Sequence, residues 1–154
     1  MEVTQEVKIG SKISNWYTHN GRQNLPWREN ITPYRIWISE IMLQQTQVNT
    51  AIDYFNRFMA KYPDLEAIKG ATEDDIYGLW SGLGYYRRAS YIYQAKEAIH
   101  LNFAGKMPDK YEDIISLPGV GKSTAGAILS IAFNKPYPIL DANVKKVISR
   151  IFYK

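Results

Sequence analysis

The sequence has 154 residues, of which 45% are hydrophobic and 22% are charged, a balance typical of one globular domain and not of a disordered chain. It contains no Cys, which excludes disulfides, cysteine nucleophiles, and metal or iron–sulfur sites ligated by cysteines of this chain. It has neither an apolar run of the roughly 20 residues that cross a membrane nor a signal peptide at its start. We therefore expect a soluble intracellular protein with no membrane partner.

The net charge of +4 is unevenly distributed along the chain. Residues 1–77 carry 8 Lys and Arg against 10 Asp and Glu, whereas residues 78–154 carry 11 against 5. A basic second half suggests a polyanionic partner, with nucleic acid as the first candidate. A solvated lysine-rich surface would have the same composition, so the charge alone leaves both interpretations open.

Helical periodicity runs through nearly the whole sequence, and no period-2 strand of convincing length appears. Thr32-Pro33 supplies an N-cap followed by proline in the first turn, and Thr72 with Asp75 resembles a capping box. Pro and Gly residues fall between the periodic segments. The sequence predicts an all-α domain with helices at 5–19, 33–46, 48–61, 72–80, 85–103, 111–116, 121–133 and 142–153.

Glu40 is a carboxylate on an unusually apolar predicted helix. Its neighbours at helical spacing include Ile36, Trp37 and Leu43. Burial among them would raise the pKa of Glu40 and favour the protonated form, which is the form that a general acid needs. The alternative is a glutamate at a solvent gap, or one paired with a distant arginine such as Arg87.

The run Leu117-Pro118-Gly119-Val120-Gly121-Lys122-Ser123-Thr124 lies between two short predicted helices. Its glycines allow a tight turn with positive φ and expose backbone N–H groups at the start of the next helix, where they can bind phosphate. The pattern is typical of the hairpin in helix-hairpin-helix DNA-binding modules. A plain turn is one alternative. A Walker A loop is a weaker one, because Ser116 stands where that motif needs Gly and no strand precedes it.

Asp141 precedes a predicted helix, so it is a candidate N-cap, a role that needs no chemistry. A carboxylate that accepts N–H bonds at a helix start is also held ionised. One protonated acid and one ionised carboxylate form the pair that cleavage of a glycosidic bond uses. Spacing alone does not show that Glu40 and Asp141 meet, since about a hundred residues separate them.

Several segments, taken together and in order, resemble the adenine DNA glycosylases of the MutY family, which belong with endonuclease III to the helix-hairpin-helix glycosylase superfamily. The segments are Leu25-Pro26-Trp27-Arg28, Ser39-Glu40-Ile41-Met42-Leu43-Gln44-Gln45-Thr46-Gln47-Val48, Gly82-Leu83-Gly84-Tyr85-Tyr86, Leu117–Gly121 and Leu140-Asp141-Ala142-Asn143-Val144. The resemblance extends from about residue 10 to the end. It implies that residues 25–135 form the six-helix domain with the hairpin, and that residues 1–24 and 136–154 belong to an incomplete second domain.

The resemblance also implies roles for three catalytic residues. Glu40 matches the glutamate that protonates adenine as a general acid. Asp141 matches the aspartate that stabilises the oxocarbenium-like sugar, and Asn143 matches an active-site asparagine near this pair. The implied reaction is hydrolysis of the N-glycosidic bond of adenine mispaired with 8-oxoguanine or guanine in double-stranded DNA. The alternative from another class is a non-catalytic helix-hairpin-helix DNA-binding fragment.

Further positions are implied to contact substrate or DNA. Trp27 and Arg28 lie in the segment that lines the adenine pocket, and Gln45 and Tyr85 match residues that enter the base stack. A flipped base leaves a void in the duplex, and such inserted side chains fill it. The remaining matches belong to the phosphate-binding hairpin: Leu117, Gly119, Val120, Gly121, Lys122 and Ser123.

Members of the MutY family usually continue with four cysteines that bind a [4Fe-4S] cluster, and then with a domain that recognises 8-oxoguanine. This sequence contains neither, so we expect no cofactor ligated by this chain. The sequence also has Ala142 where the family usually has Gly, a small residue in place of another. The resemblance implies a cytoplasmic, nucleoid-associated protein in a bacterium, or a nuclear or mitochondrial one in a eukaryote.

Ser123 distinguishes between two chemistries within the superfamily. Endonuclease III-like enzymes have a lysine nucleophile at this position, whereas here the lysine, Lys122, comes one residue earlier and points about 100° away on a helix. We therefore expect a monofunctional glycosylase with little β-lyase activity. We predict that Ser123→Lys forms a Schiff base with the sugar, which borohydride traps as a covalent DNA adduct. Efficient trapping by the unaltered protein through Lys122 would contradict this alignment.

Overall fold

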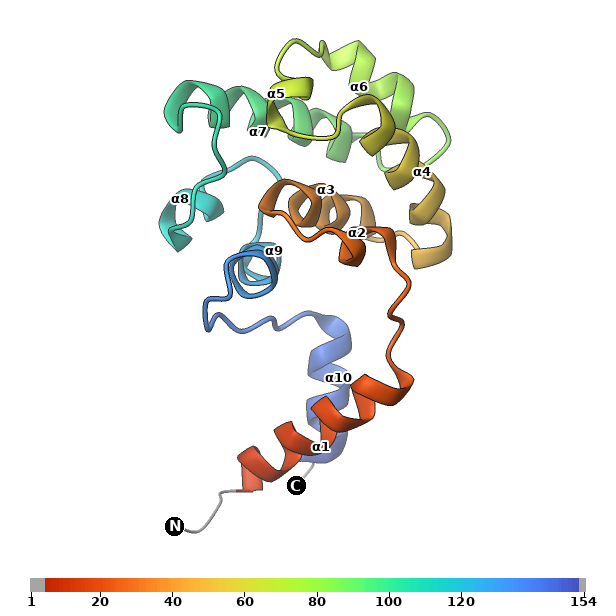
Figure 1. The fold of residues 1–154 in the computed structure, drawn as a ribbon, viewed down its shortest axis with the longest axis vertical. Coiled ribbons are helices and arrows are strands. Elements are labelled where there is room, and N and C mark those ends of the chain that lie inside the picture. The colour runs from red at the N-terminus through yellow and green to blue at the C-terminus, as the bar shows by residue number, and fades with distance from the viewer. Residues whose placement is uncertain (1–4, 153–154) are drawn as a thin grey trace.

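In the computed structural model, which describes residues 5–152, every regular element is a helix, and no strand occurs in this range (Figure 1). The all-α prediction is confirmed. No helix in the described range is long and apolar enough to span a membrane. The elements are α1 (Gln5–Asn20), α2 (Pro26–Glu29), α3 (Pro33–Leu43), α4 (Val48–Lys61), α5 (Leu65–Ile68), α6 (Glu73–Trp80), α7 (Arg87–Asn102), α8 (Tyr111–Ile115), α9 (Lys122–Ala127), η1 (Ile128–Ala132) and α10 (Ala142–Ile151).

Helix α3 lies at the centre of the larger group of helices and packs against α2, α4, α7, α9 and η1 (Figure 1). It begins as the sequence predicts: Pro33 occupies the first turn, and the Thr32 side chain accepts a hydrogen bond from the Arg35 backbone N–H at 3.2 Å. Trp37 and Ile41 on this helix are fully buried. Because α3 touches helices on nearly every side, its position fixes the positions of any polar groups that it carries.

Two predicted helices are too long at one end. The helix predicted at 33–46 ends at Leu43, because Gln45 adopts the left-handed conformation with a φ of 56°. The helix predicted at 85–103 begins at Arg87, because Tyr85 has a φ of 50°. An α-helix cannot continue through either residue, and neither is a glycine that would have signalled the break.

Three other features were not predicted. Helices α2 and α5 are single turns, too short to show a helical period in the sequence. The helix predicted at 121–133 is present, but after α9 it widens into the π-helical turn η1. A π-helical turn leaves no separate signal in the sequence, because the same apolar residues can be buried by an α-helical turn or by a π-helical turn.

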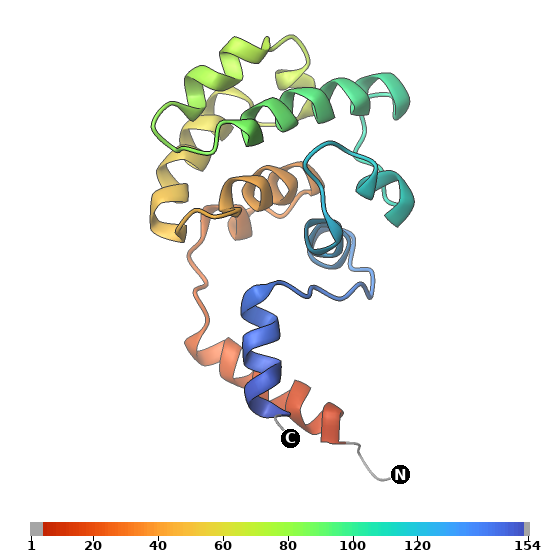
Figure 2. The same ribbon diagram turned by 180° about the vertical axis from the view of Figure 1, so that it is seen from behind.

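Helices α1 and α10 lie together at one end of the molecule, away from the larger group of helices (Figures 1 and 2). Each is joined to that group by an extended segment, residues 21–25 for α1 and residues 133–141 for α10. The helix predicted to run to residue 153 ends at Ile151, and Tyr153 lies outside the described residues. The proposed division of the chain at residues 25 and 135 remains a prediction.

The segment that leads to α10 crosses α9 at a glycine. A Cβ atom built on Gly126 would lie closer to the Pro138 carbonyl oxygen than a carbon and an oxygen can approach, so only glycine admits this crossing. Three residues later, Asp141 caps α10, and its carboxylate accepts the Val144 backbone N–H at 2.7 Å. The crossing therefore helps to determine where the Asp141 carboxylate lies.

The packing predicts different stabilities for α10 and α3. No residue of α10 is buried, and apolar side chains on and beside it are exposed, namely Leu140, Val147, Ile148, Ile151 and Phe152. Helices with few buried contacts open locally at low free energy. We expect an opening free energy at least about 1.4 kcal/mol lower for α10 than for α3, which is a tenfold faster amide hydrogen exchange. Equal protection of the two helices would contradict this prediction.

Candidate active site

Glu40 stands on α3 between two pockets. It is half-buried and lines both a larger pocket of about 780 Å³ and a smaller one of about 450 Å³. The two pockets are built from segments that are far apart in the sequence. One carboxyl group is therefore shared by two cavities of different composition.

The surroundings of Glu40 favour its protonated form. Burial first, and then the negative charge of Asp141, raise the pKa of Glu40 to about 7, although the positive charge of Arg28 acts in the opposite direction. The raised pKa that the apolar helix predicted is present. A carboxyl that exchanges its proton near neutral pH suits general acid catalysis.

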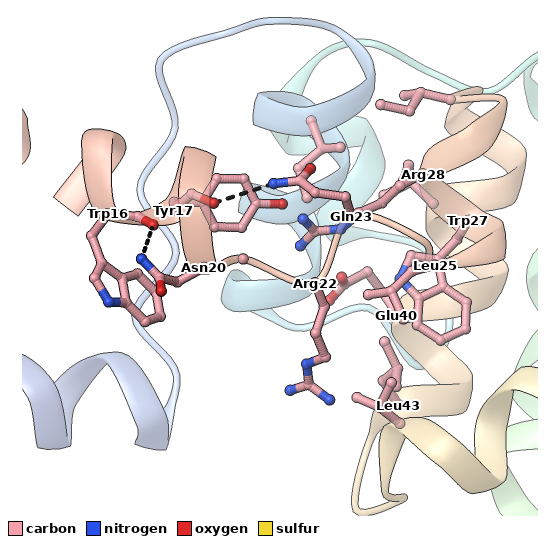
Figure 3. Close-up of a pocket in the computed structure, with 15 residues that line it drawn as sticks. Trp16, Tyr17, Asn20, Arg22, Gln23, Leu25, Trp27, Arg28, Glu40 and Leu43 are labelled. Atoms are coloured by element: carbon pink, nitrogen blue, oxygen red, sulfur yellow. Dashed lines mark hydrogen bonds between the residues drawn. The ribbon is translucent and has the colours of Figure 1, made fainter.

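The larger pocket combines an aromatic wall with polar groups. Trp27 is buried edge-on against Phe55, with ring centroids 5.4 Å apart, and Arg28 lies over the Tyr17 ring at 5.2 Å. Figure 3 shows Tyr17 on one side of this pocket and Trp27 with Glu40 on the other. An aromatic wall with a few polar groups is typical of sites that bind a flat ligand.

The contribution of α1 to this pocket was missed in the sequence. Trp16, Tyr17 and Asn20 all line it from α1 (Figure 3). Tyr17 also accepts, at its backbone carbonyl, a 3.2 Å hydrogen bond from the side chain of Gln23. The adjacent aromatic residues near the end of the predicted helix 5–19 were the available signal, but helical periodicity does not show which distant segment they face.

The smaller pocket brings together residues from three segments of the sequence. Glu40 and Gln45 come from the α3 region, Ser123 from α9, and Asp141 with Asn143 from the start of α10. Glu40 and Asp141 therefore do share a cavity, which spacing could not establish. This arrangement offers a proton donor and a second carboxylate to one ligand.

Ser123 and Lys122 have different environments, as expected for adjacent residues that point in different directions on a helix. Ser123 is half-buried and lines the smaller pocket, whereas Lys122 is exposed and is not among the described residues that line it. The lysine amine therefore does not point into the cavity that holds the two carboxyl groups.

The hairpin between α8 and α9 depends on one of its two glycines. Gly119 has a φ of 78°, and a Cβ there would lie 2.7 Å from the Tyr91 Cβ, so both its conformation and its close packing require glycine. Gly121 is different: its φ is −92° in the extended N-cap of α9. The positive φ that the two glycines allow is thus found at Gly119 and not at Gly121.

The start of α9 suits a phosphate. No side chain caps it, so N–H groups of its first turn remain for an outside acceptor. Leu117 and Val120 are buried and fix the hairpin to the core. The Walker A alternative is wrong, because the preceding segment Tyr111–Ile115 is the helix α8 and not a strand.

Gln45 and Tyr85 are both exposed, and the Tyr85 side chain retains 61% of its accessible surface. Gln45 lines the smaller pocket, while Tyr85 lies at the start of α7. Left-handed backbone at a residue other than glycine is concentrated at functional sites. Gln45 and Tyr85 share this conformation with Ala104 and Asn134, so the conformation supports a functional role for them only together with their exposure.

Residues 5–152 contain no group of three or more His, Cys, Asp or Glu side chains that could hold a metal ion. With no Cys in the sequence, this chain offers no thiolate to an iron–sulfur cluster either.

With this geometry in view, comparison with known proteins identifies the family. Residues 38–153 match the HhH-GPD superfamily of base excision DNA repair proteins. The chain belongs to this superfamily. It is 51% identical over 140 residues to an adenine DNA glycosylase of Buchnera aphidicola from Acyrthosiphon pisum, covering 91% of this chain and 40% of that protein. It is 39% identical over 159 residues to the adenine DNA glycosylase of Mus musculus, covering 97% and 31%. The chain thus spans less than half the length of these relatives.

Solved structures agree with this assignment to the HhH-GPD superfamily. A thermostable thymine-DNA glycosylase superimposes with a TM-score of 0.85 at 29% identity, covering 92% of this chain and 65% of that one. An endonuclease III in a non-covalent complex with DNA gives a TM-score of 0.81 at 20% identity, covering 98% and 70%. At that lower identity the likeness shows the fold alone, and it confirms the helix-hairpin-helix fold that the sequence predicted.

The environment of Glu40 generates a prediction that needs no substrate. We expect its carboxyl to titrate near pH 7, protonated below and ionised above, when followed by ¹³C NMR of the side-chain carboxyl carbon. Asp141→Asn removes a negative charge and should lower this pKa, whereas Arg28→Met removes a positive charge and should raise it. A midpoint near the ordinary glutamate value of about 4.3, unmoved by either substitution, would contradict the assignment.

Proposed function

We propose that this chain carries the catalytic site of a DNA glycosylase that hydrolyses the N-glycosidic bond of adenine mispaired with 8-oxoguanine or guanine in double-stranded DNA. The observation that carries the proposal is Glu40, a half-buried carboxyl with a raised pKa that is shared by the two pockets, the smaller of which also holds Asp141. Membership of a base excision repair superfamily and similarity to adenine DNA glycosylases support it.

In this proposal the larger pocket receives the adenine base. The base leaves the duplex, because its glycosidic bond cannot be reached inside the stack. Trp27 and Arg28 line the space that the base enters, and Glu40 lies at the junction with the smaller pocket. Glu40 donates its proton to a ring nitrogen, so the base departs as a neutral leaving group when the C1′–N9 bond breaks.

The sugar then faces the smaller pocket. In this proposal the Asp141 carboxylate stabilises the positive charge that develops at C1′, and Asn143, which lines the same pocket, contacts the sugar or the water. Water adds its oxygen to C1′ and gives its proton to the ionised Glu40, which restores the acid. Ser123 lines this pocket in place of an amine, so the reaction ends at hydrolysis.

The remaining residues place the duplex. The open first turn of α9 and the hairpin around Gly119 bind a backbone phosphate, with Lys122 adding positive charge. Gln45 and Tyr85 enter the base stack and fill the void that the extruded adenine leaves. These contacts hold the DNA while the two carboxyl groups act on one nucleotide.

We predict that Glu40→Gln removes most base release while leaving duplex binding nearly intact. Glutamine has almost the same size but cannot donate the acid proton, and general acid catalysis is typically worth about 10²–10⁴-fold. Single-turnover release of adenine from duplexes with A opposite 8-oxoguanine, G or T measures both the loss and the mispair preference.

Glu66→Gln provides the matched control, because it makes the same chemical change at an exposed residue of α5, outside both pockets. It should release adenine at the unaltered rate. A Glu40→Gln protein that is equally active would remove Glu40 from the mechanism. Tight binding of the unaltered chain to the duplex with no base release would favour the non-catalytic DNA-binding alternative.

A further inference from the structure

Two exposed residues with left-handed backbone lie on either side of one buried arginine. Gln45 has a φ of 56° and Tyr85 a φ of 50°, a conformation that costs free energy for any residue other than glycine. The surrounding structure must offset that cost. We define residues 43–47 as the Gln45 loop and residues 82–86 as the Tyr85 loop.

The Arg88 side chain holds the Gln45 loop from beneath. Arg88 is only 5% exposed, and its Nη1 lies 2.6 Å from the carbonyl oxygens of both Met42 and Gln44. The same nitrogen lies 2.9 Å from Thr46 Oγ1. Its acceptors therefore stand on both sides of Gln45, which fixes the backbone through the left-handed residue.

The other nitrogens of the same guanidinium hold the Tyr85 loop. Nη2 donates to the Gly84 carbonyl at 2.9 Å, and Nε donates to the Tyr85 carbonyl at 3.3 Å. The guanidinium also lies 5.6 Å from the Tyr85 ring centroid. Because the planar fork of an arginine is rigid, a shift of one loop moves the donors that hold the other.

The guanidinium of Arg88 donates mainly to backbone carbonyl groups. No carboxylate among the described side chains of residues 8–152 forms an ion pair with it. The carbonyls of Ile41 and Met42 that it approaches lie at the C-terminal end of α3, where the helix dipole favours a cation. A buried arginine that hydrogen-bonds to two loops and forms no ion pair acts by fixing the positions of those loops.

We propose that Arg88 is a positioning residue that couples the Gln45 loop to the Tyr85 loop, so that the two side chains enter the DNA base stack as a unit. The proposal rests on the proposed function for the role of these side chains in DNA. Arg88 itself contacts neither the base nor the sugar. Its removal should loosen both loops together, even in the absence of DNA.

The first experiment needs no DNA. Arg88→Lys keeps the positive charge but places its donors on a single nitrogen, which cannot span both loops. We expect amide hydrogen exchange to increase on the order of tenfold in both loops and to stay unchanged in α4. An increase confined to one loop, or absent from both, would overturn the coupling whatever the protein does to DNA.

A milder substitution guards against a folding defect in Arg88→Lys. Thr46→Val removes one acceptor of the Arg88 Nη1 and keeps the shape of the side chain. The coupling predicts faster exchange in the Tyr85 loop, because the hydrogen bonds of Thr46 connect it to that loop through Arg88. Unchanged exchange there would contradict the proposal.

Lys96→Met is the matched control for the loss of contacts from a buried cation. Lys96 is 2% exposed and donates to the carbonyl oxygens of Lys69 and Ala71, away from both loops. This variant should lower the stability of the fold but leave exchange in the two loops at the level of the unaltered protein. An equal effect of Lys96→Met on the loops would reduce Arg88 to a general stabilising residue.

The second experiment measures base extrusion in a duplex with 2-aminopurine opposite 8-oxoguanine. With Arg88 present, the effect of the double substitution Gln45→Ala and Tyr85→Ala on the extrusion equilibrium should differ from the product of the two single effects by on the order of tenfold. In proteins that also carry Arg88→Lys, the two effects should be independent and therefore multiply. Additivity in both backgrounds overturns the proposal. If the unaltered protein extrudes no base, the proposed function fails, and the exchange measurements alone decide the role of Arg88.

Discussion

The burial of α3 on nearly all sides is the constraint on which the site depends. A helix in that position has no freedom to rotate or slide, because helices and the π-helical turn surround it. A carboxyl group on it cannot move to water to lower its ionisation cost, so Glu40 remains where burial and Asp141 favour its proton. The same packing that stabilises the fold therefore sets the chemistry of its most reactive group. Burial on α3 is the larger cause of the raised pKa of Glu40, and the negative charge of Asp141 is the second.

The second carboxylate reaches the site by a different route. The chain leaves η1, passes over α9 where Gly126 leaves room for it, and starts α10 with Asp141. The N-cap interaction that begins the helix also orients the carboxylate, so one hydrogen bond serves local structure and site geometry together. Glu40 is placed by the core and Asp141 by a helix end. This explains why a small residue that does not itself line the cavity, Gly126, bears on the separation of the two acids.

Periodicity predicted the long helices because α3, α4 and α7 carry enough turns to show a period, and the Thr32 cap with Pro33 also marked the start of α3. Single turns such as α2 carry no period. The breaks at Gln45 and Tyr85 were missed because neither residue is a glycine, and the Arg88 hydrogen bonds beside them are tertiary contacts that the local sequence does not show. The apolar neighbours of Glu40 predicted its raised pKa, since those neighbours are local in the helix. The meeting of Glu40 with Asp141, and the wall that α1 supplies, depend on the path of the chain between helices, which local patterns do not contain.

The walls of the two pockets come from opposite ends of the chain: α1 closes the larger pocket and the start of α10 closes the smaller, with Glu40 between them. Neither helix belongs to the larger group around α3, and an extended segment joins each to it (Figure 2). A nucleotide that filled both pockets would thus act as a cross-link between the first helix and the last. By mass action, a ligand at a hundred times its Kd adds about 2.7 kcal/mol to the stability of the form that binds it. The substrate would then count among the groups that hold this molecule together, and its release would loosen the two outer helices.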